Sequence, residues 1–346
     1  MDVTPVPSVR VAVVQAEPVY FDLEGSVEKT IKLISEAASK SAKLVAFPEV
    51  WIPGYPSWIW ARGCDIDLVQ KYIKSSLPLK SPQMTRICEA AALHHIEVVL
   101  GYSERDGDSL YLGQSYIGSD GAIKCSRRKI KPTHMERTVF GDGSGNSLLN
   151  VVDRPGIGRV GMLCCWEHSQ PLLKYHTHSQ GEQIHVAAWP AQLPHEEGKG
   201  LWSTANEGWL PPFFTYREFL VARGFQLANQ DILSGSVNLS VTYAIEGGCF
   251  VLHTSTLISS RGVDSMRTAD GDQYYAPGGG RSCVIRPDGK IISEFLPDDQ
   301  EGLVITDLNM DDILRSKAYL DTQGHYSRPD LLWLSRNTEE MKKIRP

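Results

Sequence analysis

Apolar runs typical of buried strands alternate with helically spaced segments along most of this chain. Residues 9–19 form such a run, and residues 26–40 then repeat apolar side chains at the spacing of one helix face. A second apolar run, 43–50, contains Pro48 near its end. Chains that alternate in this way bury a sheet against helices, so the pattern predicts an α/β fold.

The same alternation continues toward the C-terminus. It predicts helices at 82–95, 170–180 and 311–320. It predicts further strands at 96–104, 110–119, 122–130, 158–165, 184–190, 249–256, 281–289, 290–296 and 301–308. The pattern alone does not separate a doubly wound open sheet from a sandwich of two sheets.

Composition and charge exclude several classes of protein. The 346 residues are enough to bury a sizeable core, and 42% of them are hydrophobic. The net charge of -6 offers no basic surface for nucleic acid or an anionic membrane. The N-terminus lacks a signal-peptide pattern, and no apolar segment reaches the roughly 18 residues of a membrane span. We therefore expect a cytoplasmic protein that binds neither nucleic acid nor membranes.

The cysteines and histidines do not form a metal-binding pattern. The seven cysteines are an odd number without a C-x-x-C pair, which argues against a disulfide framework and a zinc ribbon. The ten histidines contain no H-E-x-x-H, and His176 and His178 would face different sides of a helix. The glycine-rich stretches 141–145 and 277–281 do not match a nucleotide-binding loop. We expect neither a metal nor a cofactor.

Cys165 lies at the junction between a predicted strand and a predicted helix. Ser169 and Pro171 follow it and favour a helix start. A thiol at such a junction would meet unpaired backbone N–H groups and the positive end of a helix dipole, which both stabilise a thiolate. In the alternative interpretation Cys164 and Cys165 are small buried hydrophobic residues, as free cysteines often are. This stretch alone leaves both interpretations open.

Glu49 comes directly after the second apolar run, in a loop rich in proline, glycine and aromatic residues. A carboxylate among Trp51, Tyr55 and Trp58 would be partly desolvated, which raises its pKa toward that of a useful general base. The alternative is a solvated glutamate that only marks the end of a strand.

A third segment has the sequence RRKIK, with four basic residues in five positions. If it is extended, Arg127, Lys129 and Lys131 share one face. Such a cluster usually forms a solvated edge. In the alternative interpretation one lysine points inward. Its positive charge would then offset the negative charge of Glu49 and stabilise negative charge that develops on a substrate atom. Glu136 lies a few residues further on and could position that lysine or the base.

Three short motifs resemble, in their order along the chain, the Glu–Lys–Cys triad of the nitrilase superfamily. They are FPE with Glu49, RRK with Lys129 and CWE with Cys165. The resemblance covers nearly the whole chain and is sharpest in FPEVWIPGYP, RRKIKPTHMERTVFGDGSG, CWEHSQPLLKY and GEQIHVAAWP. These segments look like the nitrilase branch, and residues 163–190 are most similar to fungal nitrilases that act on arylacetonitriles. The resemblance implies a four-layer α-β-β-α sandwich and self-association into dimers and larger homo-oligomers.

The resemblance also implies roles for these residues. Glu49 corresponds to the general base, Lys129 to the triad lysine and Cys165 to the nucleophile. Glu136 corresponds to a second glutamate of the family. Lys131 is the nearest rival of the triad lysine.

Residues around the triad carry further expectations. We expect the backbone N–H of Trp166 to stabilise developing negative charge beside the nucleophile. Tyr55 and Trp189 are candidates for the wall of the substrate pocket, and each is equally well explained as an ordinary core residue. Cys164 is expected to be a structural neighbour of the nucleophile.

These roles imply hydrolysis of a nitrile. The thiolate would add to the nitrile carbon, and the resulting thioimidate would pass through a thioester to the carboxylic acid and ammonia, with some amide as a possible by-product. An alternative is a cyanide hydratase, which makes formamide from cyanide. A third interpretation is a nitrilase-like subunit that binds or scaffolds without catalysis.

The resemblance implies a single carbon-nitrogen hydrolase domain over residues 1–335, followed by a C-terminal tail, 336–346. Relative to the family pattern, residues 209–236 form an insertion that is apolar and aromatic. It could cover the pocket, alter a subunit interface or impair activity.

Overall fold

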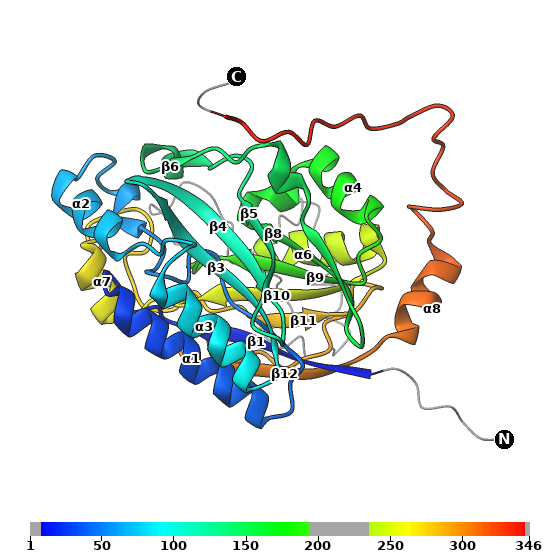
Figure 1. Ribbon diagram of the computed structural model, residues 1–346, viewed down its shortest axis with the longest axis horizontal. Helices are drawn as coiled ribbons and strands as arrows, with labels where there is room; N and C mark the ends of the chain where they lie inside the picture. The colour runs from blue at the N-terminus through cyan, green and yellow to red at the C-terminus, as the bar shows by residue number, and fades with distance from the viewer. Residues whose placement is uncertain (1–7, 194–234, 343–346) are drawn as a thin grey trace, which may run out of the picture.

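The computed structural model describes residues 8–193 and 235–342 (Figure 1). The expected α/β class is confirmed, because a large mixed sheet is covered by helices. The predicted insertion at 209–236 lies outside the described residues except for its last two, at which a helix begins. The tail after residue 335 runs to residue 342 without helix or strand.

Within the described residues the strands follow the order β5-β4-β3-β2-β1-β10-β9-β8-β7, with β12 beside β1, β11 beside β10 and β6 beside β4. Their bounds are β1 Ser8–Ala16, β2 Leu44–Ala46, β3 Glu97–Asp106, β4 Ser109–Ile117, β5 Ile123–Arg128, β6 Phe140–Gly141, β7 Val151–Arg154, β8 Gly158–Cys164, β9 Ile184–Trp189, β10 Phe250–Thr256, β11 Cys283–Ile285 and β12 Gly302–Asn309. The central strands from β3 through β2, β1, β10 and β9 to β8 are parallel, and antiparallel hairpins extend the sheet at both ends.

The sheet folds over so that two halves face each other across a common core. Alternate residues of the two halves, among them Val11, Val99, Val160 and Phe250, meet in one buried cluster. Because successive strand residues point to opposite faces, the other set points outward and is covered by helices. This gives a sandwich of two β layers between two helical layers, as expected.

Helices cover the two outer faces. On one side α1 (Leu23–Ser39) and α3 (Pro82–Leu93) pack their apolar faces on the outer side of β1–β3. On the other side α6 (Gly235–Gly247) and α4 (Pro171–Ser179) cover β8–β10 (Figure 1). The remaining helices are α2 Ile66–Ser75, α7 Ser260–Met266 and α8 Asp311–Tyr319, and the 3-10 turns are η1 Ser57–Trp60, η2 His134–Thr138, η3 Gly145–Leu148 and η4 Cys165–Ser169.

Side chains at the first turns explain where the helices start. Asp22, Asp65 and Ser81 each accept a hydrogen bond from a backbone N–H of the first turn of α1, α2 and α3. The predicted cap of α4 is wrong, because Gln170 occupies the N-cap position without a side-chain bond. The Ser169 hydroxyl instead donates to the carbonyl of Trp166.

Two strand predictions also need correction. The run 43–50 forms a strand only over Leu44–Ala46; beyond it the chain keeps single backbone contacts with β3, such as Phe47 N to the carbonyl of Val99 at 2.9 Å. The predicted strand at 290–296 makes only one bridge, from Ile285 to Ile291. Beyond it the hydroxyl of Ser293 accepts the Val284 N–H, so a side chain replaces the backbone acceptor that a strand would supply.

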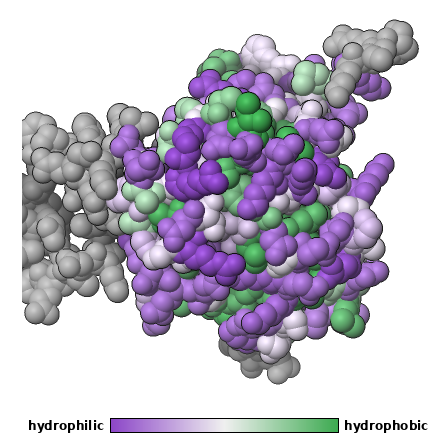
Figure 2. Space-filling model, turned by 90° about the vertical axis from the view of Figure 1, so that its left-hand side faces the viewer, coloured by the Kyte–Doolittle hydropathy of each residue, from purple (hydrophilic) through white to green (hydrophobic). Residues whose placement is uncertain are grey.

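The surface of the described residues mixes polar and apolar side chains. The face shown in Figure 2 is mostly hydrophilic, with hydrophobic residues interspersed among charged ones. None of the helices in the described ranges is both long and apolar enough to cross a bilayer.

One close approach ties the Glu49 loop to the sheet. A Cβ added to Gly101 in β3 would lie 2.2 Å from the carbonyl oxygen of Pro48 and 3.1 Å from Cα of Glu49. Both obstacles are backbone atoms, so the loop itself would have to move.

We expect Gly101→Ala to lower the free energy of unfolding by about 1–3 kcal/mol, as forced overpacking does. Chemical denaturation of the purified protein measures this loss. Gly302→Ala is the matched control, because its Cβ would meet only the Leu296 side chain, at 2.8 Å, which can move aside. Equal losses of unfolding free energy in the two variants would contradict the conclusion that the backbone of the Glu49 loop leaves no room for a side chain at Gly101.

Candidate active site

Three loops at the ends of strands bring Glu49, Lys129 and Cys165 together. Glu49 lies just beyond β2, Lys129 directly follows β5, and Cys165 directly follows β8. All three side chains are buried, with residue exposures of 1%, 0% and 3%. The carboxylates of Glu49 and Glu136 and the Cys165 sulfur approach within 4.8 Å of one another. The sequence predicted these positions from three separate motifs, and the fold places them in one cluster.

Lys129 is the centre of this cluster. Its Nζ donates to Oε1 of Glu49 at 2.8 Å and to both oxygens of Glu136 at 2.9 and 3.2 Å. Glu136 also accepts hydrogen bonds from Thr133 N and, at 3.3 Å, from the Tyr55 hydroxyl. Lys131, the rival lysine, is 62% exposed at its side chain and pairs with Asp142 instead.

Each of the three loops contains a residue in the left-handed backbone region. Val50 has φ of 49°, His134 of 48° and Cys165 of 48°. Such conformations are costly for non-glycine residues and persist where the surrounding structure enforces them, commonly at functional sites. At Cys165 the reversal directs the chain from β8 into η4 rather than onward along the strand.

The charges of the cluster do not balance when both carboxylates are ionised, because one ammonium group faces two of them. Burial raises the pKa of Glu49 to about 8, with Lys129 acting against the rise and Glu136 adding to it. Burial lowers the pKa of Lys129, but the two carboxylates outweigh this and hold it well above its usual value. Lys129 therefore stays charged, and Glu49 is the group that can exchange a proton near neutral pH.

The thiol of Cys165 starts in its protonated form. Burial raises its pKa, while Lys129 acts against the rise. The backbone N–H of Trp166 also acts to lower the pKa of the thiol and so favours the thiolate. A nucleophile in this setting needs a nearby base, and Glu49 is such a base.

A buried ion pair connects two of the site's loops. The Arg127 guanidinium donates to both oxygens of Glu167, at 2.6 and 2.9 Å, and both side chains are almost fully buried. Glu167 also accepts the backbone N–H groups of Ile130 and Cys164, each at 2.9 Å. Burial opposes ionisation of Glu167, but these donors hold its pKa below the ordinary value. The pair thus fixes the Lys129 segment against the Cys165 turn.

A small cavity of about 100 Å³ opens onto Cys165. Its lining includes Tyr55, Trp60, Glu136, Trp166 and Tyr274. Of the two predicted wall residues, Tyr55 lies on this cavity. Trp189 is not part of its lining, because its fully buried ring packs behind Trp166, with ring centroids 6.2 Å apart.

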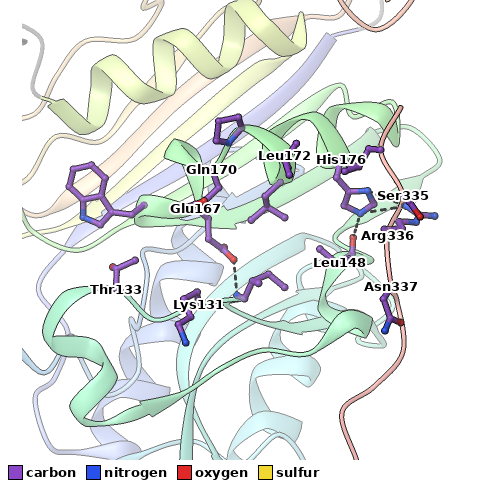
Figure 3. Close-up of a pocket in the computed structure, with 15 residues that line it drawn as sticks. Lys131, Thr133, Leu148, Glu167, Gln170, Leu172, His176, Ser335, Arg336 and Asn337 are labelled. Atoms are coloured by element: carbon purple, nitrogen blue, oxygen red, sulfur yellow. Dashed lines mark hydrogen bonds between the residues drawn. The ribbon is translucent and has the colours of Figure 1, made fainter. Parts of the chain in front are cut away.

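A second and larger cavity, of about 630 Å³, lies on the other side of Trp166, between α4 and the C-terminal tail (Figure 3). Leu148, Leu172 and Leu173 give it apolar walls, and residues 334–337 form one edge. Of the described residues only Thr133 and Trp166 line both cavities, and the thiol is not among the residues described around the larger one. The chemistry therefore belongs to the smaller cavity.

Two clusters in the described residues bring three metal-binding side chains close together, namely Glu49, Glu136 and Cys165, and His178, Glu182 and Cys249. In the first, the Lys129 ammonium already occupies the place of a cation between the carboxylates. In the second, Glu182 already accepts bonds from His178, His185 and Tyr243. Both donor sets are therefore poor fits to a metal ion.

The chain matches the carbon-nitrogen hydrolase family over residues 10–208. It belongs to that family. An arylacetonitrilase of Aspergillus kawachii is 50% identical over 337 residues, which cover 97% of this chain and 94% of that protein. An arylacetonitrilase of Aspergillus niger is 51% identical over 94% of this chain and 91% of its own length. The family expected from the sequence is thus confirmed.

Solved structures support the same fold. An amidase from Nesterenkonia sp. AN1 has a TM-score of 0.58 at 17% identity, over 91% of this chain and 96% of that one. That amidase was captured with an acetamide moiety covalently bound to its active-site cysteine. At this level of identity the likeness supports the fold alone.

Sequence reasoning missed part of the site. Arg127 looked like one charge of a basic edge, although the same alternation that turns Lys129 inward also turns Arg127 inward. Tyr274 comes from a loop without a recognisable motif. His168, three residues after Cys165, bonds to the Cys165 carbonyl and was not identified as part of the site.

We expect Arg127→Met to lower the free energy of unfolding by about 3–5 kcal/mol, because Glu167 would be left as an uncompensated buried charge. Arg10→Met is the matched control, since Arg10 makes the same two-bond contact with Asp307 at the surface. The control should lose less than about 1 kcal/mol. Denaturant titrations that gave the two variants similar losses would contradict this role of Arg127.

Proposed function

We propose that this protein hydrolyses an arylacetonitrile-type nitrile to the carboxylic acid and ammonia, with Cys165 as nucleophile, Glu49 as general base and Lys129 as the stabilising cation. The observation that carries the proposal is the buried contact of Lys129 with Glu49 and Glu136 beside the Cys165 thiol. Relatives that are about 50% identical over nearly the full chain are arylacetonitrilases, which supports the substrate class.

In the first step Glu49 takes the proton of the Cys165 thiol and the sulfur adds to the nitrile carbon. Glu49 passes that proton to the nitrile nitrogen as the triple bond becomes a double bond, and a thioimidate results. Negative charge develops on that nitrogen during the addition. Lys129 and the backbone N–H of Trp166 are the donors best placed to stabilise it.

In the second step water adds to the thioimidate carbon while Glu49 accepts its proton. The tetrahedral intermediate then expels ammonia, which carries both hydrogens of that water, one returned by Glu49 and one released as the hydroxyl group becomes the carbonyl, and a thioester remains. A second water releases the carboxylic acid and restores the thiol. If the intermediate expels the thiolate instead of ammonia, the product is an amide.

Aromatic side chains around the cavity favour an aryl group on the nitrile. Tyr55 and Tyr274 pack with ring centroids 5.5 Å apart, and Trp60 donates to the Tyr55 hydroxyl. Trp166 closes the side that faces the larger cavity. A flat ring bound between such groups gains offset or edge-to-face contacts.

We further propose that the protein works in the cytoplasm as a homo-oligomer. All seven cysteines are free thiols, which suits a reducing compartment. Leu172 and Tyr175 on α4 and Ile245 on α6 are exposed apolar side chains on the helical layer that covers β8–β10, and such side chains favour contact with a second copy.

The first experiment measures ammonia and phenylacetic acid released from phenylacetonitrile by the purified protein. We expect both in equal amounts, apart from any phenylacetamide. Formamide from cyanide with no turnover of phenylacetonitrile would favour the hydratase instead. Absence of both products, with Cys165 still reactive toward a thiol reagent, would favour a non-catalytic subunit.

We expect Cys165→Ala to abolish turnover and Lys129→Met to lower kcat by at least about 100-fold, the scale for losing a key electrostatic group. Lys131→Met is the matched control, because Lys131 is exposed and pairs only with Asp142. Its kcat should stay close to that of the wild type. Comparable losses at the two lysines would contradict the assignment of Lys129.

The rate should also depend on pH through Glu49. A base with a pKa of about 8 gains activity as the pH rises through that value, so kcat/KM should rise there. Glu136→Gln removes a carboxylate that raises the pKa of Glu49, so it should move this rise to lower pH. Asp142→Asn at the surface should leave the profile in place. A Glu136→Gln profile that is unmoved or shifted upward would contradict the coupling.

A further inference from the structure

Behind Cys165, away from the Lys129 cluster, lies a chain of three buried titratable side chains. Glu182 Oε2 contacts Nδ1 of His185 at 2.7 Å, and Nε2 of His185 contacts Nε2 of His168 at 3.0 Å. Nδ1 of His168 then contacts the carbonyl oxygen of Cys165 at 2.7 Å. His168 and His185 have no exposed surface, and Glu182 is 5% exposed.

The other oxygen of Glu182 is also occupied. Oε1 contacts Nδ1 of His178 at 2.9 Å and accepts the hydroxyl of Tyr243. The ring of Tyr243 packs on His185, with centroids 3.9 Å apart, and the ring of His168 stacks on Trp189 at 5.4 Å. The chain is therefore held rigidly on every side by α4, β9 and α6.

The number of protons in this chain follows from these contacts together with the ring orientations that bring Nε2 of His185 against Nε2 of His168. Each of the three junctions from Glu182 to the Cys165 carbonyl needs one hydrogen, because two lone pairs at such distances repel each other. An ionised carboxylate and two neutral imidazoles supply only two hydrogens. One further proton completes the chain and makes it electrically neutral overall.

We infer that His168 is a positioning residue for Cys165, held as an Nδ1–H donor to the Cys165 carbonyl by an extra proton shared along the Glu182–His185–His168 chain. This inference rests on the proposed role of Cys165. It does not depend on which of the three groups carries the proton.

The geometry explains why this contact matters. The Cys165 carbonyl and the Trp166 N–H belong to the same peptide plane, so a donor on the oxygen fixes the direction of the N–H. That N–H acts on the Cys165 sulfur to lower the pKa of the thiol. Hydrogen bonding at the carbonyl also polarises the peptide and strengthens its N–H as a donor. His168 thereby acts on the nucleophile without touching the substrate.

The surrounding charges decide how firmly the proton is held. Burial lowers the pKa of His185, the Glu182 carboxylate acts against this, and His178 and Arg127 add to the lowering. Burial also lowers the pKa of His168, as do His185 and His253, while the Cys165 carbonyl and Glu182 oppose this. The net effect is that the pKa of His185 and that of His168 both lie below their ordinary value. Cys249 and Tyr243 face the Glu182 end of the chain. Loss of the proton at rising pH would leave one junction without a hydrogen.

The test compares two substitutions of His168. His168→Leu removes the donor, whereas His168→Asn places an amide N–H close to the position of Nδ1. We expect His168→Leu to lower kcat by about 10- to 100-fold with little change in KM, which is the scale of a misplaced reacting group. His168→Asn should restore most of the loss. If both variants lost activity equally, or if neither did, the inference would be overturned.

His253→Leu is the matched control. His253 is also buried and stacks on Trp189, at 6.0 Å, but its Nδ1 contacts Ser240 rather than Cys165. Its loss should lower the melting temperature about as much as His168→Leu does, while kcat remains near the wild-type value. An equal loss of kcat would show that His168 acts only through packing.

Labelling of Cys165 by iodoacetamide, followed by mass spectrometry of its peptide, separates this inference from the proposed function. His168→Leu should slow labelling several-fold and His168→Asn should not, whether or not any nitrile is turned over. Unchanged labelling in His168→Leu overturns the inference alone. A wild type that labels at Cys165 but turns over no nitrile overturns the proposed function alone.

Glu182 offers a second, independent readout. Gln at this position can donate to His185 and still accept from Tyr243 and His178, so it completes the chain without an extra proton. Glu182→Gln should therefore keep kcat and lose any decline of kcat at alkaline pH that the wild type shows. If Glu182→Gln lowers kcat as much as His168→Leu does, or keeps the alkaline decline of the wild type, the proton count is wrong.

Discussion

The buried ammonium group of Lys129 ties the Glu49 loop to the loop that follows β5. It bonds to Glu49 beyond β2 and to Glu136 in η2, and it extends from the end of β5. A buried charge is costly unless it is paired, so these loops cannot separate without exposing an uncompensated ion. The sandwich supplies the surrounding frame, because strands from both of its halves end at this point.

Two hydrogen-bonded systems act on Cys165 from opposite sides. The Lys129 cluster faces the sulfur and sets the proton balance with Glu49. The His168 chain faces the backbone carbonyl and, through the peptide plane, the Trp166 N–H. The left-handed φ of Cys165 allows one residue to present its thiol to the first system and its carbonyl to the second. Reactivity and orientation are thus governed by different neighbours.

The sequence predicted the α/β class and the family because apolar periodicity and three ordered motifs are local signals. Glu49, Lys129 and Cys165 could be identified individually, but their contacts depend on closure of the sheet, which no local pattern encodes. The structure explains why Trp189 resembled a pocket residue: it ends β9 at the level of the site, yet its ring lies behind Trp166. Residues 290–296 have the alternating pattern of a strand but do not form one. The Ser293 hydroxyl accepts the Val284 N–H in place of the backbone carbonyl that a neighbouring strand would supply.

Arg127 and Lys129 show how charge balance separates a structural pair from a reactive one. Both side chains leave the same face of the same segment, and both are fully buried. Arg127 meets one carboxylate that also accepts two backbone N–H groups, so Glu167 keeps a low pKa and stays ionised. Lys129 meets two carboxylates, one of which lacks further donors: Glu49 Oε2 has no hydrogen-bond partner in the described structure. That unsatisfied oxygen, on a group whose pKa is raised to about 8, is the one free to take a proton from the thiol.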